Sequence, residues 1–290
     1  MSSDQSRFFP VGVVVTKAYG ALYRHFGYAL RICWAWIIVM TSARVAADLV
    51  KTYMLVDQAG RPLLGFDLTF LVGWFLFIPL ASIAVAWHRL LLLDEQDPSA
   101  LYMRLDRLVW SYFGMAVFIY VVSLAPVFVP WGLAQIVKAT AGLGAEGSPE
   151  QQPVWIYLLS PRGNPLIPFL QTIAIMVFLG LSARLGIVLP AKALARAGFT
   201  LKRVWEATRG HSWGLLMGMI FCIAPFFLVT AFLRRLGLHF SLADGPLLHI
   251  ADWLATETMG TVLGLVEVAY LTHCFLFFFP GTGEAPPEQG

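Results

Sequence analysis

The stretch Phe66–Leu93 reads FDLTFLVGWFLFIPLASIAVAWHRLLLL, and it decides the class of fold. Between Leu68 and His88 it contains no Asp, Glu, Lys or Arg, so few of these side chains are stabilised by contact with water. A helix rises about 1.5 Å per residue, and about 20 mostly apolar residues therefore cross roughly 30 Å of hydrocarbon. The stretch predicts a helix that spans a membrane.

Five further stretches share this apolar composition and predict spans at about Leu30–Val50, Leu108–Val137, Leu166–Leu189, Ser212–Leu233 and Thr256–Phe279. Of the 290 residues, 58% are hydrophobic and only 13% are charged, whereas a soluble domain has about 25% charged residues. We therefore expect an all-α, polytopic membrane protein with about six transmembrane helices. Residues 1–280 form one integral membrane domain in this interpretation, with a loop over Ala139–Pro165 and a disordered, Pro/Glu/Gly-rich tail over 281–290.

Three basic segments precede spans and show the apolar spacing of short amphipathic helices. The first covers Val11–Arg31, the second begins at Ser99, and the third follows a predicted N-cap at Thr200. Helices of this kind lie in the membrane interface, where basic side chains attract anionic lipid. The basic residues expected to face lipid are Lys17, Arg24, Arg31, Arg104, Arg107, Lys202, Arg203 and Arg209.

An aromatic residue followed by glycine occurs after each basic segment, at Gly27, Gly114 and Gly214. This pattern suggests a threefold unit of interfacial helix, outward span and returning span, although glycine and aromatic residues are abundant throughout the chain. The basic residues near span ends concentrate on the side that would hold both termini. The positive-inside rule then predicts that both termini are cytoplasmic.

Charged residues inside spans are the first candidates for function, because each costs about 2.5 kcal/mol or more at the bilayer centre. Arg184 in the fourth span and Glu267 in the sixth are natural partners, either as a structural pair or as a proton or substrate relay. Arg44 can pair with Asp48 four residues later or serve as a substrate-binding arginine in a polar cavity. The remaining secondary candidates are His88 and Arg89, at the predicted cytoplasmic end of the second span, and His273 in the sixth. Snorkelling to the lipid headgroups would explain Arg89 without a function, and a lone histidine is more often a hydrogen-bonded packing residue than a ligand.

Motifs of known enzyme classes are missing from the sequence: it has no H-E-x-x-H, G-x-S-x-G, P-loop or G-x-G-x-x-G pattern. The cysteines lie singly in apolar runs, at Cys33, Cys222 and Cys274, without the spacing of a metal site. We therefore expect no enzymatic activity, no cofactor, no metal site and no nucleic-acid partner.

Two stretches resemble a family. They are Ala86–Glu95 (AWHRLLLLDE) and Arg184–Ala191 (RLGIVLPA), the latter continuing to Trp205–Gly210 (WEATRG) and Trp213. The chain resembles uncharacterised bacterial six-helix inner-membrane proteins, which are distantly similar to the membrane domain attached to some glycerophosphodiester phosphodiesterases. The resemblance implies a helical protein of the bacterial inner membrane. No stretch is long and polar enough to hold the phosphodiesterase barrel, so no catalytic residue carries over.

These observations favour a non-enzymatic inner-membrane protein with an accessory or structural role in the envelope, organising lipid, especially anionic lipid, or a membrane-protein partner. The alternative is a small-molecule transporter or permease that uses the intramembrane Arg and Glu residues. An intramembrane enzyme acting on lipid comes third, because no polar motif of the needed density occurs.

The predicted topology can be tested with reporter fusions after Ala145 and after Gly198, positions that six spans place on opposite sides of the membrane. An alkaline-phosphatase fusion should be active after Ala145, and a green-fluorescent-protein fusion should fluoresce after Gly198. Signals that put both positions on one side would contradict the six-span prediction.

Overall fold

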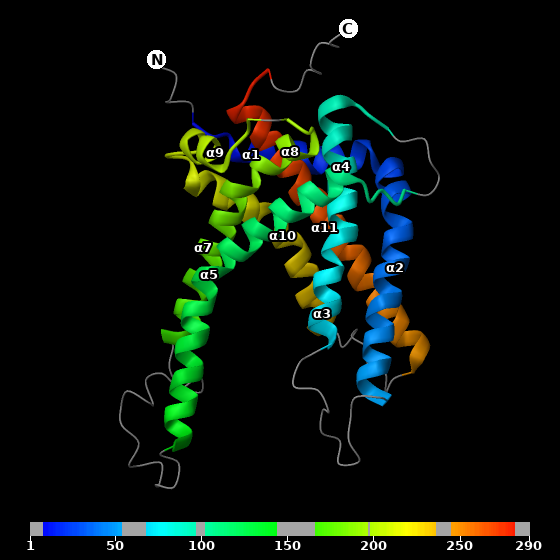
Figure 1. Ribbon diagram of the computed structural model, residues 1–290, viewed down its shortest axis with the longest axis vertical. Coiled ribbons are helices and arrows are strands. Elements are labelled where there is room, and N and C mark those ends of the chain that lie inside the picture. The colour runs from blue at the N-terminus through cyan, green and yellow to red at the C-terminus, as the bar shows by residue number, and fades with distance from the viewer. Residues whose placement is uncertain are drawn as a thin grey trace.

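A computed structural model describes residues 8–53, 68–96, 102–143, 166–196, 198–235 and 245–281. All regular secondary structure within these ranges is helical, so the chain is an all-α protein (Figure 1). The helices are α1 Val11–Arg24, α2 Phe26–Tyr53, α3 Leu68–Phe75, α4 Phe77–Leu93, α5 Arg107–Leu143, α7 Leu166–Gly186, α8 Val188–Ala193, α9 Leu201–Ala207, α10 Ser212–Arg235 and α11 Pro246–Phe278.

Six stretches of the described residues are helical, long and apolar enough to cross a bilayer, so this is a multi-pass membrane protein. They are Phe26–Lys51, Val72–Leu93, Arg107–Phe128, Phe169–Ala193, Ser212–Leu233 and Pro246–Phe278. Each corresponds to one span predicted from the sequence, although α11 begins at Pro246 rather than at Thr256. The loop prediction is wrong over Ala139–Leu143, where α5 continues. The rest of that loop, and the tail beyond Gly281, lie outside the described residues.

Two spans are interrupted just before a proline. Proline has no N–H to donate to the carbonyl four residues earlier, so the helical bonding pattern is interrupted there. The interruption before Pro79 falls at Leu76 and separates α3 from α4, and the one before Pro190 falls at Ile187 and separates α7 from α8. The first interruption is far from the end of α4 at Leu93, whereas the second is close to Ala193. The interruptions therefore lie at different depths.

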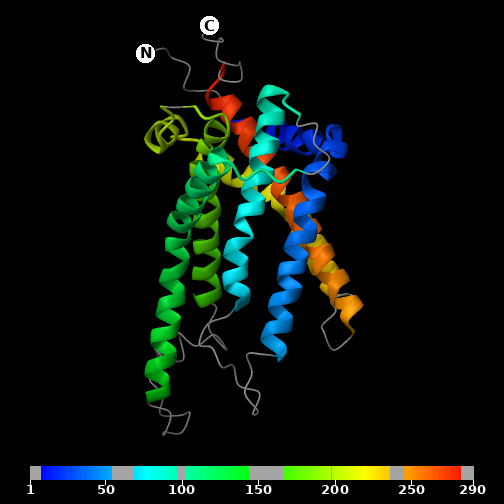
Figure 2. The ribbon, with the colours of Figure 1, turned by 45° about the vertical axis from the view of Figure 1, so that its right-hand side comes forward.

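Helix α1 lies across one end of the bundle, and the other long helices run away from it (Figures 1 and 2). The end of α11 and helices α8 and α9 lie at this same end, which is called the α1 end below. At the opposite end, α5 and α7 stay together and diverge from α2, α3 and α4 (Figure 1).

The first basic segment, predicted over Val11–Arg31, forms the separate helix α1 only as far as Arg24, and Phe26–Arg31 begin α2. Val14, Ala18 and Ala21 of α1 are buried, while Lys17 and Arg24 are exposed. The buried face packs on α10 and α11, and the Tyr19 hydroxyl donates a hydrogen bond to the carbonyl of Cys222 at 2.8 Å.

The second basic segment is not helical between Tyr102 and Asp106, so the prediction of a helix there is wrong, and Ser99 lies outside the described residues. Asp106 instead starts α5 by accepting the backbone N–H of Val109 at 3.0 Å, and it also pairs with Arg104. Burial raises the pKa of Asp106, but the Val109 N–H and the Arg104 guanidinium outweigh it and hold the pKa below its ordinary value. An N-cap residue has a non-helical backbone conformation, so the helix that starts at Arg107 does not continue back through Asp106.

The third basic segment starts as predicted, since the side chain of Thr200 caps α9 by accepting the N–H of Arg203 at 3.3 Å. The glycines of the suggested threefold unit, however, are not equivalent. A side chain at Gly214 would meet the ring of Phe9, whereas one at Gly27 or Gly114 would meet nothing within 4 Å.

The closest approach between spans in the described residues that requires glycine occurs where α10 meets α11. Gly218 of α10 is buried, and a Cβ there would lie 2.7 Å from Cζ of Tyr270. The Tyr270 ring cannot move aside easily, because it is fully buried and its hydroxyl donates to the carbonyl of Leu215 at 2.8 Å. Small residues at such positions allow membrane helices to pack closely.

We predict that Gly218→Ala lowers the stability of the protein by about 1–3 kcal/mol, because the added methyl group overpacks the contact with Tyr270. Thermal unfolding in detergent micelles measures the effect as a lower Tm. The matched control is Gly114→Ala, which should leave Tm unchanged or raise it, since alanine favours helix by about 1 kcal/mol over glycine. Equal Tm values for the two variants would contradict the proposed contact.

Candidate functional site

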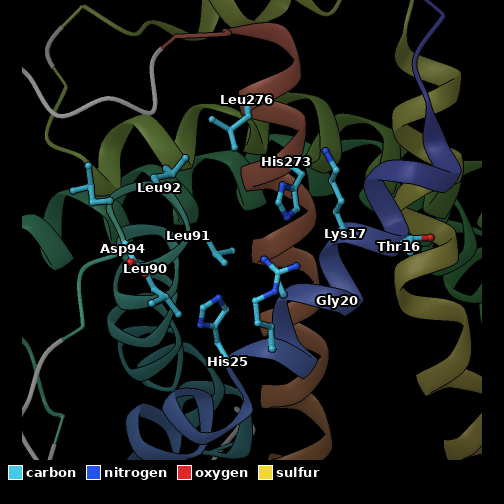
Figure 3. Close-up of a pocket in the computed structure, with 13 residues that line it drawn as sticks. Thr16, Lys17, Gly20, His25, Leu90, Leu91, Leu92, Asp94, His273 and Leu276 are labelled. Carbon is cyan, nitrogen blue, oxygen red and sulfur yellow. The ribbon is translucent and has the colours of Figure 1, made fainter.

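A pocket of about 800 Å³ opens at the α1 end between α1, the end of α4 and the end of α11. Four basic or imidazole side chains line it, together with one carboxylate, Asp94 (Figure 3). We call it the cationic pocket and define it by Lys17, Arg24, His25, Asp94 and His273. Figure 3 shows Lys17 of α1 beside His273 of α11, with His25 below them and Asp94 across the space.

Local structure explains how these side chains come together. Lys17 and Arg24 are seven residues apart, which is two helical turns and places both on one face of α1. His25 ends α1, with its backbone N–H bonded to the carbonyl of Ala21 at 3.0 Å, and its ring lies edge-on to Trp87 at 6.4 Å. Asp94 ends α4 in the left-handed conformation, with φ of 53°.

The charges in the cationic pocket favour an anionic ligand. Lys17 and Arg24 are both exposed, so their ammonium and guanidinium groups are accessible to a ligand. A phosphate group offers only acceptor oxygens, which suit these donors. Within the described ranges, no three His, Cys, Asp or Glu side chains are grouped so that they could hold a metal ion.

Arg184 and Glu267, the predicted intramembrane pair, are not brought together in the structure. The Arg184 guanidinium stacks over the ring of Trp205 at 3.4 Å, and its Nε donates to the Thr208 hydroxyl at 2.8 Å. Arg184 lies in the last turn of α7, close enough to the α1 end to reach α9. The pairing prediction is therefore wrong.

Arg44 and Asp48 also bond to a neighbouring helix rather than to each other. Arg44 Nε lies 3.2 Å from Glu257 Oε1, and Asp48 Oδ2 accepts the indole N–H of Trp253 at 2.7 Å and lies 3.1 Å from Nε2 of His249. The three partners are on the first turns of α11, and two of them precede the predicted start of that span. The sequence analysis started the sixth span after these turns, so it offered Arg44 no partner nearer than Asp48.

His88 is completely buried and belongs to a hydrogen-bonded network within the membrane. The hydroxyl of Thr272 donates to the carbonyl of Val268 at 2.8 Å, so it accepts from His88 Nδ1, which is 2.7 Å away. His88 Nε2 is then the acceptor for the Tyr112 hydroxyl at 3.2 Å. The network joins α4, α5 and α11.

Arg89, the neighbour of His88, is bonded to other residues of the protein. It forms a salt bridge with Glu95, and its NH1 donates to the carbonyl of Ala193 at 3.3 Å. These bonds connect the end of α4 to α8.

The other basic residues expected to face lipid have varied surroundings. Arg31 lies 5.0 Å from the ring of Tyr28, and Arg203 lies 4.5 Å from the ring of Phe199. Three more of the predicted basic residues are exposed: Arg107 on α5, Lys202 on α9, and Arg209 just after α9. Of the eight basic residues, Lys17 and Arg24 line the cationic pocket.

Sequence reasoning missed His25 and Asp94 of the cationic pocket, as well as Tyr112 and Thr272 of the His88 network. His25 directly follows Arg24 and could have been found by extending the basic face of α1. Tyr112 and Thr272 carry no sequence signal, because their roles depend on how three helices are rotated about their own axes.

No protein-family model, curated protein or solved structure matches the chain significantly. The resemblance to the membrane domain of glycerophosphodiester phosphodiesterases therefore stays a prediction.

We predict that Tyr112→Phe destabilises the protein by about 1–3 kcal/mol, because it leaves His88 Nε2 buried without its donor. Thermal unfolding in micelles should show a lower Tm. The control is Tyr23→Phe, in which the replaced ring is 89% exposed and Tm should not change. A Tyr112→Phe protein as stable as wild type would show that the network contributes nothing.

Proposed function

We propose that this protein is a non-enzymatic membrane protein that organises lipid by binding an anionic headgroup in the cationic pocket. The observation that supports this most directly is the convergence of Lys17, Arg24, His25 and His273 on one space. A volume of about 800 Å³ is ample for a phosphate group with its glycerol substituents.

The position of the pocket suits a headgroup. It lies where the spans containing α4 and α11 end, which is the depth at which phosphates of a bilayer lie. Helix α1 lies across this end with its apolar face buried and Lys17 and Arg24 exposed. A basic helix at the end of the spans presents such side chains to anionic headgroups.

We further propose that the membrane is the bacterial inner membrane and that both termini are cytoplasmic. The family resemblance and the excess of basic residues near the α1 end support this orientation. The cytoplasmic leaflet is rich in anionic lipid and attracts each nearby Lys or Arg by about 1 kcal/mol.

A transporter is the second candidate, and the observation that favours it is Glu267, a charged residue inside a span that lines a separate apolar pocket. The helix interruptions at Leu76 and Ile187 weigh against it, since they lie at different depths. Transporters with repeated halves place broken helices at matching positions around a central site.

We predict that the double variant Lys17→Gln/Arg24→Gln binds phosphatidylglycerol about thirtyfold more weakly than wild type, since it loses about 2 kcal/mol of attraction. Native mass spectrometry of the protein titrated with this lipid in detergent measures the affinity. Phosphatidylcholine should bind wild type and variant equally.

The matched control is Lys202→Gln/Arg209→Gln, which removes the same charge from exposed residues outside the pocket. It should weaken binding far less. A second pair of variants tests the space itself: Gly20→Phe fills the pocket, because a Cβ there meets nothing within 4 Å, and Gly12→Phe places the same ring outside it. Equal affinities within both pairs would contradict a headgroup site in the cationic pocket.

A further inference from the structure

A second pocket of about 280 Å³ lies between α4, α5 and α11, at a distance from the α1 end. Its lining is almost entirely apolar and includes the rings of Phe77, Tyr112 and Phe113. Gly260 and Gly264 of α11 also line it, and a Cβ at either glycine would meet nothing within 4 Å, so the glycines leave the space open. We call this the Glu267 pocket after the carboxylate that lines it.

Glu267 lies inside the membrane-spanning part of α11. It precedes His273 of the cationic pocket by six residues, or about 9 Å along the helix, and the end of α11 by eleven residues. Among the residues that the structure describes, Glu267 has neither a hydrogen-bond partner nor an ion-pair partner. An uncompensated carboxylate at this depth is costly, and such residues usually serve a function.

The other polar side chains of the pocket are already engaged. The Tyr112 hydroxyl donates to His88 Nε2 at 3.2 Å, and the Thr261 hydroxyl donates to the carbonyl of Glu257 at 2.7 Å. An anionic or neutral polar ligand would therefore find no free donor among these side chains. The group left for a ligand is the carboxylate of Glu267, whose charge is complementary to a cation.

The aromatic lining adds to this selectivity. The faces of Phe and Tyr rings attract organic cations, by about 0.5–2 kcal/mol according to how far the cation is desolvated. Phe77, Tyr112 and Phe113 supply such rings in the lining of the pocket, while its aliphatic lining accommodates an apolar group. The pocket thus combines a carboxylate and aromatic rings for a positive charge with an aliphatic lining for an apolar group.

We propose that the Glu267 pocket binds a lipophilic organic cation, a quaternary or protonated amine attached to an apolar group, with Glu267 as its counter-ion. This site is separate from the cationic pocket and does not depend on headgroup binding there. The two sites have opposite charge preferences, so a ligand with only one sign of charge is not expected to bind at both.

The experiment compares two probes that differ in one atom. Phenyltrimethylammonium has a quaternary nitrogen where tert-butylbenzene has a neutral carbon, so the two match in shape and differ in charge. Saturation-transfer NMR on the full-length protein in micelles of a non-ionic maltoside detergent, which contains no amine, measures binding of each. Wild type should bind the ammonium at least tenfold more tightly than the hydrocarbon, and Glu267→Gln should abolish that preference.

A pair of glycine variants tests the pocket without changing Glu267, in case the Glu267→Gln protein does not fold. Gly264→Leu fills the pocket and should lower ammonium binding at least tenfold, whereas Gly114→Leu, also at a site with open space, lies outside the pocket and should not. Glu206→Gln removes an exposed charge on α9 and should also have no effect. Equal binding of the two probes to wild type, or undiminished ammonium binding by Gly264→Leu, would overturn the proposal.

Discussion

Polar side chains inside a bilayer are costly unless they find partners, and α11 meets this constraint by bonding to a different neighbour at successive levels. Glu257 pairs with Arg44 of α2, Tyr270 donates to a carbonyl of α10, and Thr272 accepts from His88 of α4. Apolar side chains gain little by leaving lipid for another helix, so packing and polar contacts decide which helices meet. Both pockets are lined by α11 and depend on this arrangement.

Glu267 is the exception on α11, because it lacks such a partner within the described part of the chain. The neighbouring polar groups are paired among themselves, which leaves a carboxylate in an apolar space. It thus differs from the carboxylate of Glu257, which is bonded to Arg44. Its position therefore points to a ligand, whereas the buried His88 is explained by hydrogen bonds alone.

The spans could be predicted from the sequence because lipid acts as a uniform solvent and requires long apolar runs. Where polar residues continue a helix, that reasoning failed, as in the first turns of α11, which contain His249 and Trp253. The partners of Arg184 and Arg44 could not be predicted either. These partners depend on how each helix is rotated about its axis and where it ends, and the hydropathy of the sequence predicts neither. Lys17 and Arg24 were found because both belong to one helix, but His273 joins them only through the tertiary fold.

The cationic pocket connects the fold with the proposed function, and its occupancy in the native membrane tests that connection most directly. The protein can be extracted with its surrounding lipid in polymer nanodiscs, without detergent, and the lipids quantified by mass spectrometry. Headgroup binding at Lys17 and Arg24 predicts that anionic phospholipid is enriched over the bulk membrane and that Gly20→Phe removes the enrichment while Gly12→Phe does not. Lipid of bulk composition around the wild-type protein would contradict it.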